Sequence, residues 1–198
     1  MFQDYGRSLM PWLNVTSNVT LPLRGRYNKA ERARRAEPAL ESVGLHNVGD
    51  RYPWQLSGGM QQRVAIARAL VYQPQVLLMD EPFASVDAQT REDLEDLVLR
   101  VRDESGQAIV LITHDIDEAI YLADRVIVLG GKPASVHADL EVPLGRGRDQ
   151  LATKARPEFL ELRSTVHHLI QGGSIAHTSA PPAAPADRLT SDIGSDTP

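Results

Sequence analysis

The segment that decides the fold is Val76-Leu77-Leu78-Met79-Asp80-Glu81-Pro82, in which four apolar residues run directly into two carboxylates. A short apolar run of this kind is typical of a strand buried on both faces, as in a parallel sheet covered by helices. The two acids then stand where the strand leaves the sheet, and ligands of open α/β sheets collect at that edge. An aspartate there can hold Mg²⁺, and an adjacent glutamate can deprotonate an attacking water, although a solvated acidic loop is an equally simple interpretation of the segment alone.

Two further apolar runs, at 109–112 and 126–129, have the same character. Helical patterns lie between the three runs, at 88–103 and 115–123, so the middle of the chain predicts βαβαβ order and an α/β fold with a parallel sheet. Residues 1–27 have the composition of a loop. The other predicted elements are a helix from Asn28 to Gly44 that Pro38 kinks or divides, a helix after Gly58-Gly59, a strand at 134–142 and an amphipathic helix at 157–171.

The composition limits the class of protein. The 198 residues include 21 basic and 26 acidic side chains, a net charge of −5, which argues against a nucleic-acid partner. The absence of cysteine excludes disulfide scaffolds, thiolate catalysis and Cys-ligated metal sites. No apolar run approaches the ~18 residues of a membrane span, and the N-terminus lacks the apolar region of a secretory signal. We therefore expect a soluble cytosolic domain.

A glycine-containing segment precedes the second predicted helix. In Leu56-Ser57-Gly58-Gly59-Met60 the glycines let a phosphate approach the backbone, and Ser57 supplies a hydroxyl. The start of the helix adds free N–H groups and the positive end of its dipole. The simpler interpretation is that Ser57 only caps the helix and the glycines form a turn.

Two more polar segments follow the Asp-Glu pair. Ala84-Ser85-Val86-Asp87 comes at short range, and the predicted strand at 109–112 runs into Thr113-His114-Asp115. A histidine at the edge that carries the Asp-Glu pair can hydrogen-bond a phosphate oxygen or the attacking water, although a lone histidine there is more often structural.

In this order and spacing, the motifs resemble the ATPase subunit of ABC transporters, a P-loop NTPase family, across about residues 2–130. The matching segments are Phe2-Gln3-Asp4 (Q-loop), Leu56–Met60 (signature motif), Val76–Glu81 (Walker B), Ala84–Asp87 (D-loop) and His114 (switch histidine). The resemblance implies ATP and Mg²⁺ as cofactors, and it implies that two ATPase subunits sandwich two nucleotides.

The resemblance also implies a role for each matching residue. Glu81 is the catalytic base, His114 contacts the γ-phosphate region and Asp80 supports Mg²⁺. Gln3 senses Mg²⁺ and nucleotide and links to the permease. The residues implied to lie across the dimer interface, against ATP on the opposite subunit, are Ser57, Gly58, Gly59, Met60 (where the family usually has Gln) and Asp87.

One motif of the family does not occur in the sequence. The Walker A loop needs Gly-x-x-x-x-Gly-Lys followed by Ser or Thr, and Gly44 and Gly49 have the spacing but precede Asp50. We therefore expect a partial ABC ATPase domain, incomplete at its N-terminus, that folds poorly and binds ATP weakly on its own. The alternative is a non-catalytic ABC-like interaction module or remnant. A chromosome-maintenance ATPase and a Ser/His/Asp hydrolase fit less well, because long heptads and a Gly-x-Ser-x-Gly elbow are lacking.

The resemblance implies partners and a location as well. Leu9–Val15 and Arg156–Arg163 resemble the nitrate, sulfonate and taurine importer branch. Such a subunit pairs with a second ATPase subunit, binds transmembrane permease subunits and serves a solute-binding protein indirectly, at the inner face of the plasma membrane. Trp12, which lies next to the Q-loop in sequence, is the predicted permease contact. The predicted divisions are 1–75 (Q-loop, helical subdomain and signature helix), 76–150 (catalytic α/β core half), 151–171 (C-terminal helix) and 172–198 (disordered tail).

Overall fold

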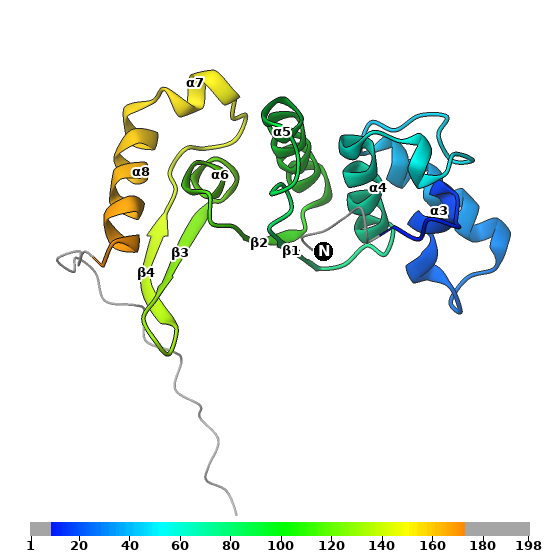
Figure 1. The fold of residues 1–198 in the computed structure, drawn as a ribbon, viewed down its shortest axis with the longest axis horizontal. Coiled ribbons are helices and arrows are strands. Elements are labelled where there is room, and N and C mark those ends of the chain that lie inside the picture. Colours follow the sequence, from blue (N-terminus) through cyan, green and yellow to red (C-terminus); the bar gives the residue numbers. More distant parts are fainter. Residues whose placement is uncertain (1–8, 173–198) are drawn as a thin grey trace, which may run out of the picture.

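The structure is a computed structural model, and it describes residues 9–172 (Figure 1). Gln3 and almost all of the predicted tail therefore lie outside the described residues. The elements in chain order are α2 (Val15–Val19), η1 (Leu21–Leu23), α3 (Lys29–Glu41), η2 (Pro53–Gln55), α4 (Gly58–Leu70), β1 (Val76–Asp80), α5 (Ala88–Ser105), β2 (Ala108–Ile112), α6 (Ile116–Leu122), β3 (Arg125–Gly130), β4 (Ser135–Glu141), α7 (Gln150–Lys154) and α8 (Pro157–Ile170).

The first part of the chain is helical. The predicted start of α3 is confirmed, because the Asn28 side chain accepts a hydrogen bond from the Glu31 N–H at 2.9 Å. Of the two predicted effects of Pro38, a kink or a division, the division does not occur: α3 is continuous through Pro38, whose ring is exposed while Ala39 and Leu40 anchor the last turn in the core. The loop expected over 1–27 also contains a short helix, α2, which packs against α3 and α4.

The strands form two separate sheets among the described residues. β1 and β2 are parallel, and β3 and β4 form an antiparallel hairpin. The order βαβαβ and the parallel pairing of β1 with β2 are as predicted, but the third apolar run differs, since β3 pairs with β4 and not with β2.

The β1–β2 sheet is covered on one face. Leu77 and Met79 of β1 are buried, whereas Val76 and Leu78 are about half exposed, as are Val110 and Ile112 of β2. The expectation of burial on both faces therefore fails for the described residues, because helices cover one side only. Figure 1 shows α5 standing over these strands, with α4 on one side and α6 on the other.

The C-terminal part packs around α6, where α7 and α8 both contact it. Tyr121 and Ile120 of α6 and Phe159 of α8 are fully buried there, so this part shares the core of the central helices. Across residues 9–172, no helix has both the length and the apolar character that crossing a membrane requires.

Candidate nucleotide site

Glu81 lies just beyond β1 in an unusual backbone conformation. Its φ angle is 45°, in the left-handed region that non-glycine residues seldom occupy. Its N–H donates a hydrogen bond to the carbonyl of Ile112 at 2.8 Å, which holds the turn to the end of β2. Backbone strain of this kind concentrates at functional sites. No pattern in the sequence predicts this conformation.

His114 meets Glu81 as the sequence predicts. Asp80 pairs with Ile112 in the parallel register, so the residues that follow the two strands emerge at the same edge. The His114 Nδ1 atom lies 2.7 Å from the Glu81 Oε1 atom, although the residues are 33 positions apart. The hydrogen bond to Glu81, together with its charge, raises the pKa of His114 above its ordinary value. Protonated imidazole donates through both nitrogens, which suits a phosphate oxygen.

Open space adjoins the histidine. A cavity of about 680 Å³ is bordered by His114 and Asp115 on one side and by Arg163 and His167 of α8 on the other. His114 itself is 79% exposed and Glu81 is 19% exposed. A ligand can therefore approach the imidazole while the carboxylate stays largely shielded.

Asp80 fits a magnesium ion that also takes phosphate oxygens as ligands. It is the last residue of β1, and its exposed carboxylate stands at the edge that carries Glu81. Residues 9–172 hold no group of three or more acidic, His or Cys side chains arranged to bind a metal by themselves. Mg²⁺ commonly takes one or two carboxylates and completes its shell with water and substrate phosphates, so one carboxylate at this edge is compatible with it.

The glycine-flanked start of α4 is exposed. Ser57 caps this helix, because its Oγ accepts a hydrogen bond from the Met60 N–H at 3.3 Å. Its hydroxyl proton stays available to a ligand. A Cβ built on Gly58 has no atom within 4 Å, so the backbone here lies open to a neighbour.

Gly59 is packed against the start of α5. A Cβ on Gly59 would lie 2.6 Å from Cγ2 of Thr90, so a larger residue at position 59 would require one of the two to shift. Thr90 in turn donates to Asp87, from its N–H at 3.0 Å and from its hydroxyl at 2.7 Å. These hydrogen bonds lower the pKa of Asp87 and keep it ionised. The structure thus brings the segment that holds Ser57 close to Asp87, as neighbouring parts of one surface.

Gln62 is a residue that the sequence analysis missed. It is fully buried on α4, and its side-chain amide donates to the carbonyl of Pro82, next to Glu81. Its Oε1 atom is buried without a hydrogen-bond partner in the described part of the chain. The signal was a glutamine one helical turn before the apolar residues Ala65 and Ile66 that line the core.

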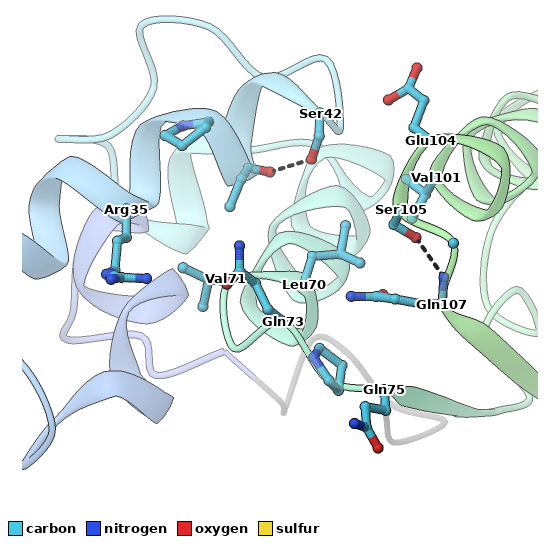
Figure 2. Close-up of a pocket in the computed structure, with 14 residues that line it drawn as sticks. Arg35, Ser42, Leu70, Val71, Gln73, Gln75, Val101, Glu104, Ser105 and Gln107 are labelled. Atoms are coloured by element: carbon cyan, nitrogen blue, oxygen red, sulfur yellow. Dashed lines mark hydrogen bonds between the residues drawn. The ribbon is translucent and has the colours of Figure 1, made fainter.

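A second cavity lies away from this site, at the other end of β1. It has a volume of about 670 Å³ and opens between the ends of α3, α4 and α5. In Figure 2, Arg35, Gln73 and Gln107 line it, and Ser105 accepts a hydrogen bond from the Gln107 N–H. It brings none of the predicted site residues together.

The fold and site define a class. Two carboxylates and a histidine lie at the carboxyl edge of the parallel strands. The exposed start of α4 packs nearby against the start of α5. This is the arrangement of α/β domains that bind phosphorylated ligands.

Comparison with known proteins identifies the family. Residues 1–84 match the sequence profile of the ABC transporter family. The chain is 46% identical over 168 residues to the taurine import ATP-binding protein TauB of Chromobacterium violaceum, covering 82% of this chain and 64% of that protein. It is 46% identical over 165 residues to the aliphatic sulfonates import ATP-binding protein SsuB 1 of Xanthomonas axonopodis pv. citri, covering 81% of this chain and 66% of that protein. It is 44% identical over 173 residues to the uncharacterized ABC transporter ATP-binding protein MJ0412 of Methanocaldococcus jannaschii, covering 86% and 62%.

Solved structures agree. The dimeric structure of a post-hydrolysis state of the ATP-binding cassette MJ0796, bound to ADP and Pi, is 37% identical with a TM-score of 0.58, and the match covers 71% of this chain and 61% of that one. The chain belongs to the ABC transporter family of ATP-binding proteins. It spans less than two thirds of the length of these three relatives. The predicted resemblance and fold class are confirmed.

Proposed function

We propose that this chain provides the signature, Walker B, D-loop and switch segments of an ATP-hydrolysing import subunit that powers uptake of a small anion such as nitrate, a sulfonate or taurine. The observation that carries the proposal is the contact of Glu81 with His114 at 2.7 Å, at the strand edge that also carries Asp80. The names of the relatives support the importer branch, since they are taurine and aliphatic sulfonate import ATP-binding proteins.

The chemistry follows from these side chains. Asp80 holds Mg²⁺, which when bound neutralises charge on the nucleotide phosphates. Glu81 orients the attacking water and accepts its proton. His114, held by Glu81 and more readily protonated than an isolated histidine, donates to the oxygens of the transferred phosphoryl group.

The second group of residues faces a nucleotide on another subunit. The start of α4 offers a hydroxyl and backbone N–H groups from Ser57, Gly58, Gly59 and Met60. Asp87 lies nearby, because Thr90 contacts Gly59 and is hydrogen-bonded to Asp87. Support comes from the open space at Gly58 and from the dimeric state of the solved cassette. A second copy of the chain, or another ATPase subunit, completes the site. Gln3 takes the role of nucleotide sensor.

The remaining partners follow from the importer assignment. Permease subunits bind at a surface that includes Trp12, which is 70% exposed, and a solute-binding protein acts through them. This places the subunit at the inner face of the membrane. The alternative, a non-catalytic interaction module, keeps the surface at Ser57 but loses hydrolysis.

A chimera tests the proposal. This chain replaces the matching part of the Chromobacterium violaceum taurine import protein, so that the remainder of that protein supplies the other segments. We expect ATP turnover within about tenfold of the parent protein, and loss of about 10²-fold or more on Glu81→Gln. A folded chimera that binds ATP but turns over no faster than its Glu81→Gln form would overturn the proposal and favour the non-catalytic alternative.

A further inference from the structure

Charged groups from α5 and from the start of α6 meet behind the candidate site. Arg91 and Glu95 stand one turn apart on α5, and Asp115 and Glu118 stand three residues apart at the start of α6. Glu95 and Glu118 are almost fully buried, at 2% and 5% exposure. Burial raises the pKa of Glu118, and the facing carboxylates of Glu95 and Asp115 raise it further, while Thr113 and Arg91 lower it. The cluster therefore brings together three carboxyl groups, those of Glu95, Asp115 and Glu118.

Arg91 is a cation of α5 that faces the start of α6, where Arg163 of α8 separately pairs with Asp117. Its Nη1 atom lies 3.9 Å from Oδ2 of Asp115, and the side chain is 35% exposed. Its Nε atom is buried and, within residues 9–172, has no hydrogen-bond partner. An unsatisfied buried N–H destabilises the fold. The interaction that offsets this cost is the electrostatic attraction between the guanidinium and the nearby carboxylates. Glu95 has a cation of its own, with Lys154 Nζ at 3.5 Å.

Asp115 connects this cluster to the histidine. The Asp115 N–H donates to the Thr113 hydroxyl at 3.0 Å, which closes a turn around His114. The Asp115 carboxylate also accepts from the Glu118 N–H at 3.1 Å and so caps α6. Asp115 therefore takes part in both structures, through its backbone N–H in the turn and through its carboxylate at the start of α6.

The same arginine belongs to the helix that begins at the predicted subunit interface. Asp87 is the N-cap of α5, and Arg91 N–H donates to the Asp87 carbonyl at 2.9 Å in the first turn. α5 and α6 pack against each other, so Arg91 joins the segment of Asp87 to the turn of His114.

We propose that Arg91 is a positioning residue: through Asp115 it holds the turn that presents His114 to Glu81, and it ties that turn to the helix that starts at Asp87. The geometric part stands on this chain alone. Its consequence for ATP turnover rests on the proposed function.

The test follows the His114 imidazole by NMR titration in the full chain, with the signal assigned from a His114→Gln sample. Arg91→Met keeps the length of the side chain and removes its charge. If the turn is released, His114 leaves Glu81 and its pKa falls by about 0.5 unit or more, towards the ordinary value. Loss of a nearby positive charge without movement would raise the pKa of His114 instead. The direction of the change in the His114 pKa therefore distinguishes loss of positioning from loss of a nearby charge.

Three variants complete the experiment. Arg91→Lys keeps the charge and should recover at least half of the shift, and Arg100→Met, on the exposed side of the same helix, should leave His114 unchanged. If Arg91→Met does not fold, Arg91→Gln, which keeps a polar side chain, takes its place. The direction of the change in the His114 pKa is then interpreted in the same way. A rise, or no change, of the His114 pKa in a folded Arg91 variant overturns the proposal.

The chimera supplies an independent readout. There we expect Arg91→Met to lower kcat by about tenfold with little change in KM, since only the reacting groups are displaced. If the unsubstituted chimera has no activity, the proposed function fails, whereas the NMR result still decides the role of Arg91.

Discussion

The Nδ1 atom of His114 lies 2.7 Å from Oε1 of Glu81, across the ends of two parallel strands. The contact depends on two backbone features. The register opposes Asp80 and Ile112, and the left-handed φ of Glu81 turns the chain sharply directly after β1. In the function that we propose, a proton acceptor and a hydrogen-bond donor to phosphate thus stand together before any ligand arrives, which would reduce the reorganisation that the reaction requires.

The contact predicts the titration of His114. Glu81→Gln removes the negative charge while keeping an acceptor oxygen, so the pKa of His114 should fall towards its ordinary value. NMR titration of the imidazole in the full chain measures this. The His46 signal, from the distant region between α3 and α4, serves as the internal reference. An unchanged His114 midpoint would show that the contact does not persist in solution.

The same pair predicts two different defects in the chimera. Glu81→Gln should retain ATP binding and slow hydrolysis by about 10² or more, as expected for loss of a general base. His114→Ala should also impair turnover, because the side chain that donates a hydrogen bond to the phosphate is lost. Steady-state hydrolysis together with a nucleotide-binding measurement separates the two steps. Near-normal turnover of the Glu81 variant moves the base role elsewhere, and unchanged kinetics of the His114 variant removes that residue from the site.

Much of this site was predictable from local patterns. The apolar run before Asp80 and the matching run before Thr113 predict two strands, and parallel strands present their carboxyl ends at one edge, which brings Glu81 and His114 together. Ser57 and Asp87 were predictable as helix starts because Ser and Asp before a helical pattern are strong N-caps.

What the sequence could not predict depends on tertiary contacts. The strain at Glu81, the packing of Gly59 on Thr90 and the bond from Gln62 to Pro82 each join segments whose approach no local pattern encodes. The error on sheet burial has a related cause. A continuous apolar run predicts that a strand has two faces to cover, but it does not say which segment covers the second face.

The chain should bind ATP weakly on its own. The described site offers His114 and the N–H groups of an exposed helix start, but the sequence contains no Walker A lysine to neutralise the phosphates. Titration of the purified chain with a fluorescent ATP analogue such as mant-ATP checks this. Micromolar affinity would contradict the expectation and would show that the present residues suffice for binding.

Burial of Glu118 makes stability depend on pH. Desolvation is the main cause that raises its pKa from 4.5 to about 7; the hydrogen bond with Thr113 opposes it, the charges of Glu95 and Asp115 add to it, and Arg91 opposes it weakly. The folded state therefore binds this proton more tightly than the unfolded state, and the free energy of unfolding falls as pH rises from 4.5 through 7.

Glu118→Gln should remove this fall in the free energy of unfolding at high pH. At pH 8 the variant should be more stable than the parent chain by on the order of 2 kcal/mol, and at pH 4 the two should be nearly equal. Urea unfolding at both pH values measures the difference. Glu104→Gln, an exposed carboxylate on the end of α5, is the control and should behave as the parent chain at both. Equal stability of the Glu118 variant at pH 8 would show that the carboxylate is solvated.

The two glycines at the start of α4 should respond in opposite ways to alanine. A Cβ on Gly58 meets no atom within 4 Å, and alanine favours the helix, so Gly58→Ala should be neutral or stabilising by up to about 1 kcal/mol. A Cβ on Gly59 would lie 2.6 Å from Cγ2 of Thr90, so Gly59→Ala should destabilise by about 1–3 kcal/mol. Thermal or urea unfolding of both variants makes the comparison.

A second substitution identifies the cause. Thr90→Ser deletes the methyl group that Gly59→Ala would strike and keeps the hydroxyl that donates to Asp87. Combined with Gly59→Ala, it should recover most of the lost stability, and the coupling should show as non-additivity in a double-mutant cycle. If the two changes are additive, the starts of α4 and α5 do not touch in solution, and Ser57 and Asp87 cannot act as one surface towards a second subunit.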